Sequence, residues 1–255
     1  MIIRAIIIFF ISTVFCYGGT IDPNKSDSKH IEYGQQHECV LKIKGFNRDS
    51  DNTPYSASCV AINPGYVLTA AHVIENSLVQ LIIDDNNQIY IGDKVVIPTE
   101  YKYNKKSQYD IAIVKLKTNL SLSFYPALYD KDDEIGKICS IAGYGYPGTF
   151  VNGYSISKYD NKKRAGSNEI ESIINHVLIC CIDKKKTTSL ELSISPGDSG
   201  GGLFINQKLA GINSYIDAPD GKADGTYGDN TAHTRISVYK NWIEQTITKL
   251  EQESK

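Results

Sequence analysis

The stretch that decides the fold reads Ser195-Pro196-Gly197-Asp198-Ser199-Gly200-Gly201 and places one serine among three glycines. A nucleophilic serine needs such a loop, because the backbone must turn sharply to aim its Oγ outward. The same turn can direct the N–H groups of Gly197 and Ser199 toward one point, where an oxyanion would sit. Serine is a weak nucleophile without a neighbouring base, so the loop predicts a histidine and an orienting carboxylate elsewhere in the chain.

Two further segments supply these partners. His72 lies in Val67-Leu68-Thr69-Ala70-Ala71-His72-Val73, and Asp110 opens the apolar run Asp110-Ile111-Ala112-Ile113-Val114-Lys115-Leu116. With these segments the chain resembles the chymotrypsin/trypsin family of serine endopeptidases. That family combines a TAAH segment, a D-I-A-x-x-x-L strand and a G-D-S-G-G loop in the order His, Asp, Ser.

The resemblance extends over roughly residues 31–250. Residues 139–145 (CSIAGYG) resemble the segment that begins the second barrel of the family, and residues 211–215 (GINSY) resemble the strand that receives the substrate backbone. Residues 234–243 (TRISVYKNWI) resemble the closing strand and the C-terminal helix. The resemblance therefore implies an all-β fold of two six-stranded antiparallel β-barrels with a C-terminal α-helix.

The hydrophobic pattern by itself predicts a mostly β protein. Short β-branched or apolar runs, separated by Gly, Asn and Asp clusters, predict strands at residues 40–44, 78–83, 88–91, 111–116, 138–142, 176–181 and 208–212. Apolar residues recur at helical spacing only near the C-terminus, where Trp242 is expected to anchor the helix in the core. We expect a signal peptide at 1–18, a short propeptide at 19–30 and a protease domain at 31–255. Within it, the barrels span about 31–129 and 131–240 and the helix about 237–251.

The N-terminus predicts export. Arg4 precedes an apolar stretch at residues 5–15, which is too short to span a membrane, and small residues allow cleavage after Cys16 or Gly18. We expect a secreted protein, extracellular or periplasmic, without a stable membrane anchor; an uncleaved anchor is the alternative. Export permits disulfides, but their connectivity stays open. The five cysteines beyond the leader are an odd number: Cys39, Cys59, Cys139, Cys180 and Cys181.

Charge and composition exclude several classes of partner. The net charge is −2, and it becomes −3 when the leader removes Arg4, so nucleic-acid binding is not expected. The basic runs at 162–164 and 184–186 are interpreted as solvated loops, and residues 84–87 as a hairpin turn rather than a cation loop. No metal-binding spacing is present, so neither a metal nor a cofactor is expected. The expected partners are protein or peptide substrates and protein inhibitors, and the protein is expected to be a monomer.

The resemblance assigns roles to the catalytic residues. Ser199 would attack the scissile carbonyl, and His72 would take its proton and deliver it to the leaving amine. Asp110 would hold the imidazole in one tautomer, with Ser214 hydrogen-bonded nearby, and the N–H groups of Gly197 and Ser199 would form the oxyanion hole. Taken singly, a histidine is usually structural and an aspartate before an apolar run often lies at a strand edge. The remaining histidines, His30, His37, His176 and His233, are expected to be structural or solvent-facing.

Asp198 carries a separate hypothesis. In the trypsin-like branch this aspartate receives an α-ammonium group made by proteolytic activation, and Ile31-Glu32-Tyr33-Gly34 stands 41 residues before His72 in a comparable place. The resemblance thus implies an activation ion pair between Ile31 and Asp198. Glu32, Tyr33 and the preceding His30 depart from the family pattern. In the alternative interpretation, Asp198 pairs with an internal cation or hydrogen-bond donor.

Alignment to the family also suggests a substrate pocket. Ser193 would lie at the base of the S1 pocket, where trypsins carry aspartate, so a preference for Arg or Lys is not expected. Bulky side chains would line the walls of a shallow apolar pocket that suits small or medium aliphatic P1 residues. The expected substrate-binding residues are Ser193, Ile194, Ser214, Tyr215, Ile216 and Thr231.

The sequence therefore predicts a secreted serine endopeptidase that works through an acyl-enzyme. A non-catalytic protease homologue, acting as a binding or adhesion module, is the alternative from another class. Such homologues commonly lose the serine or the histidine, whereas this chain keeps both. An esterase of the α/β-hydrolase type is disfavoured, because its triad runs in the order Ser, Asp, His.

Overall fold

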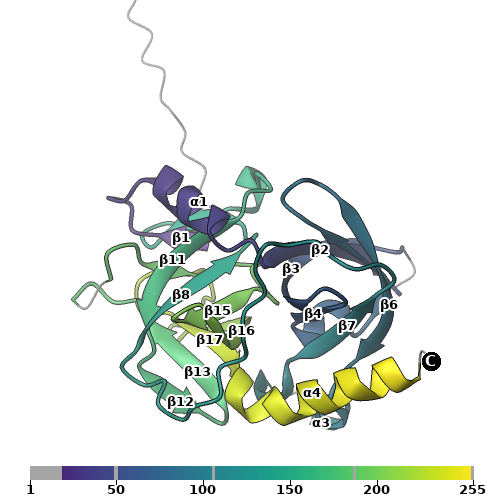
Figure 1. Cartoon of the computed structure of the whole chain (residues 1–255). Coiled ribbons are helices and arrows are strands. Elements are labelled where there is room, and N and C mark those ends of the chain that lie inside the picture. The colour runs from purple at the N-terminus through teal and green to yellow at the C-terminus, as the bar shows by residue number, and fades with distance from the viewer. Residues whose placement is uncertain (1–18, 49–50, 105–106, 186–187, 254–255) are drawn as a thin grey trace, which may run out of the picture.

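The computed structural model describes residues 19–253 except 49–50, 105–106 and 186–187. Two β-rich lobes lie side by side, and a long C-terminal helix runs beneath them (Figure 1). The first lobe is a closed barrel in the order β2-β3-β4-β7-β6-β5, as predicted. Its strands are β2 (Val40–Asn47), β3 (Pro54–Asn63), β4 (Tyr66–Thr69), β5 (Ser77–Ile83), β6 (Ile89–Val96) and β7 (Ala112–Leu116).

Alternate side chains of the first barrel pack into two different hydrophobic cores. This explains the unbroken apolar runs in its strands. On β7, Ala112 and Val114 point into the barrel, whereas Ile113 joins a cluster that also contains Phe204 and Ile212 of the second lobe. Successive residues of a strand face opposite sides, so a strand buried on both sides must be apolar throughout. This arrangement packs the two lobes against each other through a shared apolar cluster.

The second lobe differs from the predicted closed six-stranded barrel. Seven strands form one sheet in the order β11-β8-β15-β16-β17-β13-β12. The extra strand arises because the two positive-φ residues Asn175 and His176 turn the chain between β12 and β13. The strands are β8 (Ile138–Gly143), β11 (Arg164–Glu169), β12 (Ser172–Ile174), β13 (Val177–Cys181), β15 (Gly202–Ile205), β16 (Lys208–Asp217) and β17 (Asn230–Arg235).

A small third sheet holds the beginning of the described chain. Its order is β10-β9-β1-β14, with bounds β1 (Gly19–Ile21), β9 (Pro147–Thr149), β10 (Gly153–Tyr154) and β14 (Leu192–Ser193). All three residues of β1 are buried, and Thr20 Oγ1 donates a hydrogen bond to the carbonyl of Gly225. The segment predicted as a propeptide thus begins as an interior strand of the fold.

The same segment continues into helix α1 (Asp27–Gln35), which lies over β11. Its buried face is polar: Asp27 accepts hydrogen bonds from Arg164 Nε and Nη2 at 2.6 and 2.9 Å, and Arg164 is 1% exposed. A Cβ on Gly34 would stand 2.7 Å from the carbonyl oxygen of Lys163, so the helix approaches the sheet through a glycine. These contacts bind residues 27–35 to the second lobe.

The C-terminal helix α4 (Ile236–Gln252) is confirmed within one residue of its predicted bounds. Ile236, Tyr239, Ile243 and Leu250 bury one of its faces in the core that both lobes share, and Trp242 packs edge-on to Tyr239. Short helical turns occupy connections: α2 (Ala71–Ile74), α3 (Thr99–Asn104), η1 (Ser107–Tyr109) and η2 (Ile156–Lys158).

Candidate active site

A histidine and an aspartate meet at the edge of the first barrel. The one-turn helix α2 leaves the backbone N–H of His72 without an intrahelical acceptor, and this N–H donates to Asp110 Oδ1 at 2.9 Å. The ring Nδ1 of His72 lies 2.7 Å from Asp110 Oδ2. Since an ionised carboxylate only accepts, Nδ1 carries the proton and Nε2 is left as the basic nitrogen.

The environment of this pair tunes both groups for proton transfer. Burial alone would lower the pKa of His72, but the hydrogen bond and negative charge of Asp110 outweigh it and raise that pKa above its usual value. Burial would raise the pKa of Asp110, but the contacts with His72 and Ser214 lower it. Asp110 therefore stays ionised, while the side chain of His72 keeps 40% of its surface exposed toward solvent.

An irregularity in the second lobe directs Ser214 toward Asp110. The pairing of β16 with β17 shifts register between Asn213 and Tyr215, so Ser214 has no partner across the sheet. Such bulges re-aim side chains near active sites. The Ser214 hydroxyl donates to Asp110 Oδ2 at 2.5 Å, and the Thr234 hydroxyl donates to the Asp110 carbonyl at 2.9 Å. Two strands of the second lobe thus hold the aspartate of the first.

The Ser199 loop docks against the segment that precedes His72. The carbonyl of Ser199 accepts the N–H of Ser58 at 2.9 Å. Gly200 has φ +84°, and a Cβ there would lie 2.1 Å from Thr69 Oγ1, so only glycine fits. No hydrogen bond joins the Ser199 hydroxyl to His72, both of which belong to the described chain. Such bonds are often long without substrate.

Two backbone N–H groups of this loop remain available. Within the described ranges, the N–H groups of Gly197 and Ser199 donate to no protein acceptor. Gly197 has φ +98°, a conformation that favours glycine. The buried Ser58 hydroxyl donates to the Gly197 carbonyl at 2.8 Å and accepts the Tyr144 N–H at 2.9 Å, so the first barrel holds the loop in place. The sequence motifs did not identify Ser58 as a residue that supports this loop.

The buried carboxylate of Asp198 is bound by neutral donors. Its Oδ1 accepts the Gly145 N–H at 2.8 Å, and its Oδ2 accepts the Ser195 N–H at 2.9 Å. Burial raises the pKa of Asp198 to about 6, although these hydrogen bonds oppose the shift. Ile31 lies inside α1, over β11, so the intact chain does not bring the two predicted ion-pair partners together. That pair would require cleavage and rearrangement of α1.

The predicted specificity residues gather around β14, β16 and β17. Ser193 is buried opposite Thr20 of β1, and its hydroxyl donates to the Ile194 carbonyl at 3.3 Å. Ile194 belongs to a buried apolar cluster against which Ile216 packs. Three of the predicted residues differ in exposure: Ser214 and Thr231 are buried, whereas Tyr215 is 37% exposed.

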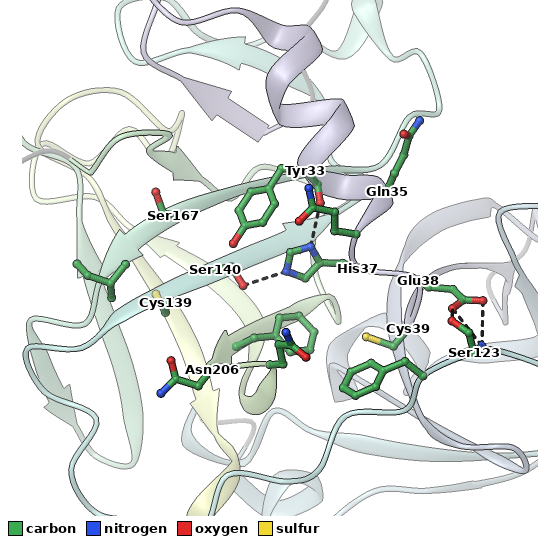
Figure 2. A pocket seen from close by; sticks show the side chains of 15 residues that line it. Tyr33, Gln35, His37, Glu38, Cys39, Ser123, Cys139, Ser140, Ser167 and Asn206 are labelled. Carbon is green, nitrogen blue, oxygen red and sulfur yellow. Dashed lines mark hydrogen bonds between the residues drawn. The ribbon is translucent and has the colours of Figure 1, made fainter.

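A separate pocket of about 680 Å³ lies between the end of α1 and both lobes (Figure 2). His37 stands at its centre, with Nε2 2.9 Å from the Ser140 hydroxyl and Nδ1 3.1 Å from the Tyr33 carbonyl. Burial and the charge of Lys163 lower the pKa of His37. The Nδ1 atom of His37 contacts a backbone carbonyl rather than a carboxylate. His37 therefore lacks the negative charge that Asp110 places beside His72.

The remaining residues considered in the sequence are three histidines and the cysteines. His30 is fully buried, with Nδ1 3.0 Å from the Ala165 carbonyl, and burial lowers its pKa to about 4. His233 is buried among polar partners, and His176 lies in the turn before β13. Cys39, Cys59, Cys139 and Cys180 are buried thiols, and the Cys139 and Cys180 sulfurs are 3.9 Å apart.

The described residues contain neither a candidate membrane-spanning helix nor a candidate metal-binding cluster. Among them, no helix has the length and apolarity needed to cross a membrane. The same residues contain no cluster of three or more His, Cys, Asp or Glu side chains placed to hold a metal ion.

Comparisons with known proteins agree with this geometry. The family model described as Trypsin matches residues 33–243. Chymotrypsin-C of Bos taurus is 28% identical over 229 residues, which cover 77% of this chain and 80% of that protein. Trypsin of Sarcophaga bullata is 27% identical over 209 residues, covering 74% of this chain and 78% of that protein.

Solved structures share the fold. Neuropsin, a serine protease expressed in the limbic system of mouse brain, superposes with a TM-score of 0.64 at 18% identity, over 84% of this chain and 96% of that one. The scabies mite inactivated protease paralogue S-I1 gives a TM-score of 0.65 at 16% identity, over 91% and 99% of the two chains. Because the family model spans most of the sequence, the chain belongs to the trypsin family of serine endopeptidases.

Proposed function

We propose that this protein is a secreted serine endopeptidase that cleaves peptide bonds through His72, Asp110 and Ser199. The observation that carries the proposal is the His72 imidazole, which is bound to Asp110 through Nδ1 and leaves Nε2 free to act as a base. Ser199 lies on a loop docked against Thr69, close in sequence to that imidazole.

The proposed reaction passes through an acyl-enzyme. The Ser199 oxygen attacks the scissile carbonyl while its proton moves to Nε2 of His72, and the carbonyl oxygen becomes an oxyanion facing the N–H groups of Gly197 and Ser199. His72 then gives its proton to the leaving amine as the C–N bond breaks. Water, deprotonated by His72, attacks the ester in the same geometry and releases Ser199. Asp110 stabilises the imidazolium in both halves.

The substrates proposed for this site are proteins or peptides with a small or medium aliphatic P1 residue. Ser193 provides no charge at the proposed pocket base, and Ile194 and Ile216 supply apolar surface beside it. Because the wall residue Ile216 is bulky, we expect Ile216→Gly to shift preference toward larger apolar P1 residues. A peptide library read by mass spectrometry measures this preference. Cleavage mainly after Arg or Lys by the native protein would refute the assignment of Ser193.

The test of the function compares the native protein with Ser199→Ala. We expect peptide cleavage that disappears in the variant, and covalent labelling of Ser199 by a fluorophosphonate probe, located by peptide mass spectrometry. Labelling also requires His72, so His72→Ala should abolish it. A folded native protein that neither cleaves peptides nor reacts with the probe would contradict the proposal and favour a non-catalytic homologue.

A further inference from the structure

We propose that Asn213, oriented by His233, is a positioning residue that aims the oxyanion-binding N–H of Ser199. The inference rests on the proposed function and adds roles for two residues to which the resemblance assigned none. Both side chains are fully buried. Their effect on the reaction would therefore pass through the backbone of the Ser199 loop.

Asn213 holds this loop at three points and contacts strand β8 at a fourth. Its side-chain Nδ2 donates to the carbonyls of Ala142 and Asp198 at 3.1 and 3.2 Å. Its backbone carbonyl accepts the N–H of Gly200 at 2.8 Å, and its backbone N–H donates to the carbonyl of Gly201 at 2.8 Å. The bonds to Asp198 and Gly200 lie on the two sides of Ser199, so one residue fixes both flanks of the nucleophile.

The contact with Asp198 acts directly on the oxyanion donor. The Asp198 carbonyl and the Ser199 N–H belong to one planar peptide unit and point in opposite directions. The carbonyl is held by Asn213 Nδ2 and by the N–H of Gly201, the latter at 2.9 Å. Holding the oxygen in place fixes the plane, and thereby the direction in which the Ser199 N–H points. Rotation of this peptide would turn that N–H away from the oxyanion.

His233 determines the orientation of the Asn213 side-chain amide, that is, the positions of its Oδ1 and Nδ2 atoms. Both Nδ2 protons are used on carbonyls, so Oδ1 must be the acceptor in its 2.9 Å contact with His233 Nδ1. Nδ1 of His233 therefore carries the proton, and Nε2 accepts the Thr231 hydroxyl at 2.8 Å. Burial lowers the pKa of His233 to about 3, so the ring stays neutral and the directions of these bonds do not change at working pH.

The test uses two matched comparisons. Asn213→Leu keeps the branched shape but removes the donor to Asp198. His233→Phe removes the donor to Asn213, whereas His233→Asn restores an amide N–H near the position of Nδ1. We expect kcat to fall about 10–100-fold in Asn213→Leu and about 10-fold in His233→Phe, with KM within about threefold, because loss of a complete oxyanion donor costs more. His233→Asn should stay within about threefold of the native kcat.

A readout beyond activity separates positioning from structural support. Rates are normalised to active sites titrated with the fluorophosphonate probe, so unfolded protein does not contribute. The affinity for a peptide aldehyde, which forms a tetrahedral adduct on Ser199, should weaken by the same factor as kcat. A kcat per active site within twofold of native in Asn213→Leu would overturn the inference, even if the variant melts at a lower temperature.

The native protein provides a test that needs no variant. Nitrogen-15 chemical shifts should show His233 as a neutral ring protonated at Nδ1. A ring protonated at Nε2, or a doubly protonated ring at neutral pH, would overturn the inference even if every variant failed to fold. Failure of the proposed function would look different, because the native protein itself would show no Ser199-dependent cleavage.

Discussion

Replacing Ser58 with alanine should weaken both the fold and the reaction. The Ser58 side chain is fully buried and joins the lobes, since its hydroxyl donates to the Gly197 carbonyl and accepts the Tyr144 N–H. Ser58→Ala leaves the buried Tyr144 N–H without a partner, at about 1–3 kcal/mol, and removes the partner of the part-buried Gly197 carbonyl at a smaller cost. We expect the free energy of unfolding to fall by about 2–4 kcal/mol.

The effect on catalysis should be smaller than the loss of an oxyanion donor. Ser58 holds the Gly197 carbonyl, not its N–H, so Gly197 keeps its donor but loses one restraint on its direction. We expect kcat to fall about tenfold, equivalent to about 1.4 kcal/mol, with little change in KM. Kinetics on a small peptide ester measure this change at low enzyme concentration, where self-digestion is slow.

Ser56 offers a matched control on the same face of the same strand. Its hydroxyl is half-buried and makes one long contact, 3.3 Å, with the Tyr159 hydroxyl. Ser56→Ala should therefore change stability by no more than about 0.5 kcal/mol. Urea unfolding of both variants is measured in a Ser199→Ala background, which prevents proteolysis. If Ser58→Ala were as stable and as active as Ser56→Ala, the assignment of Ser58 as the link between the lobes would be wrong.

Three further predictions concern charge and chain processing. Asp110→Asn should lower kcat strongly and move the acid limb of the pH–rate profile to lower pH, because the charge that raises the pKa of His72 is gone; an unshifted limb in stopped-flow assays would count against this. Burial raises the pKa of Glu191 from 4.5 to about 8, and both its oxygens lack partners, so the native state keeps a proton that the unfolded chain has already released; stability should decline as pH rises from about 4.5 to about 8 and level off above that. Glu191→Gln should melt like native protein at pH 5 and higher than native at pH 9; parallel melting curves would refute this. Protein that begins at Gly19 should be active, whereas protein that begins at Ile31 lacks β1 and should lose stability and activity; a fully active Ile31 form would show that β1 is dispensable.

The candidate catalytic residues could be selected from the sequence because each stands in a local pattern that the proposed chemistry requires. The positive φ values of Gly197 and Gly200, and the apolar run after Asp110, are visible as residue types in the sequence. Helix α4 could be predicted because its apolar residues recur with helical period, and short apolar runs predicted strands, whereas the closed first barrel was expected from the family resemblance. What these elements share is a direct correspondence between local sequence and local structure.

Other elements escaped prediction because tertiary contacts define them. Helix α1 has no apolar stripe, since it buries Asp27, His30 and Gly34 against β11. Strand β1 has three residues, too few for any periodicity to appear. The roles of Ser58 and Asn213 depend on carbonyl groups that fold back from distant loops. No spacing within the sequence encodes such contacts, and only the packing of the two lobes brings them together.

The free thiols determine how this protein responds to its redox surroundings. Cys39, Cys59, Cys139 and Cys180 are buried and form no disulfide with one another, so the contacts among these described positions are non-covalent. Dithiothreitol or glutathione should therefore leave activity unchanged, because these four cysteines present no disulfide for them to reduce. We expect protein produced under reducing and under oxidising conditions to have the same activity. For a protease whose two lobes are joined by hydrogen bonds, we therefore expect oxidation of these buried thiols to disturb the packing rather than to complete the structure.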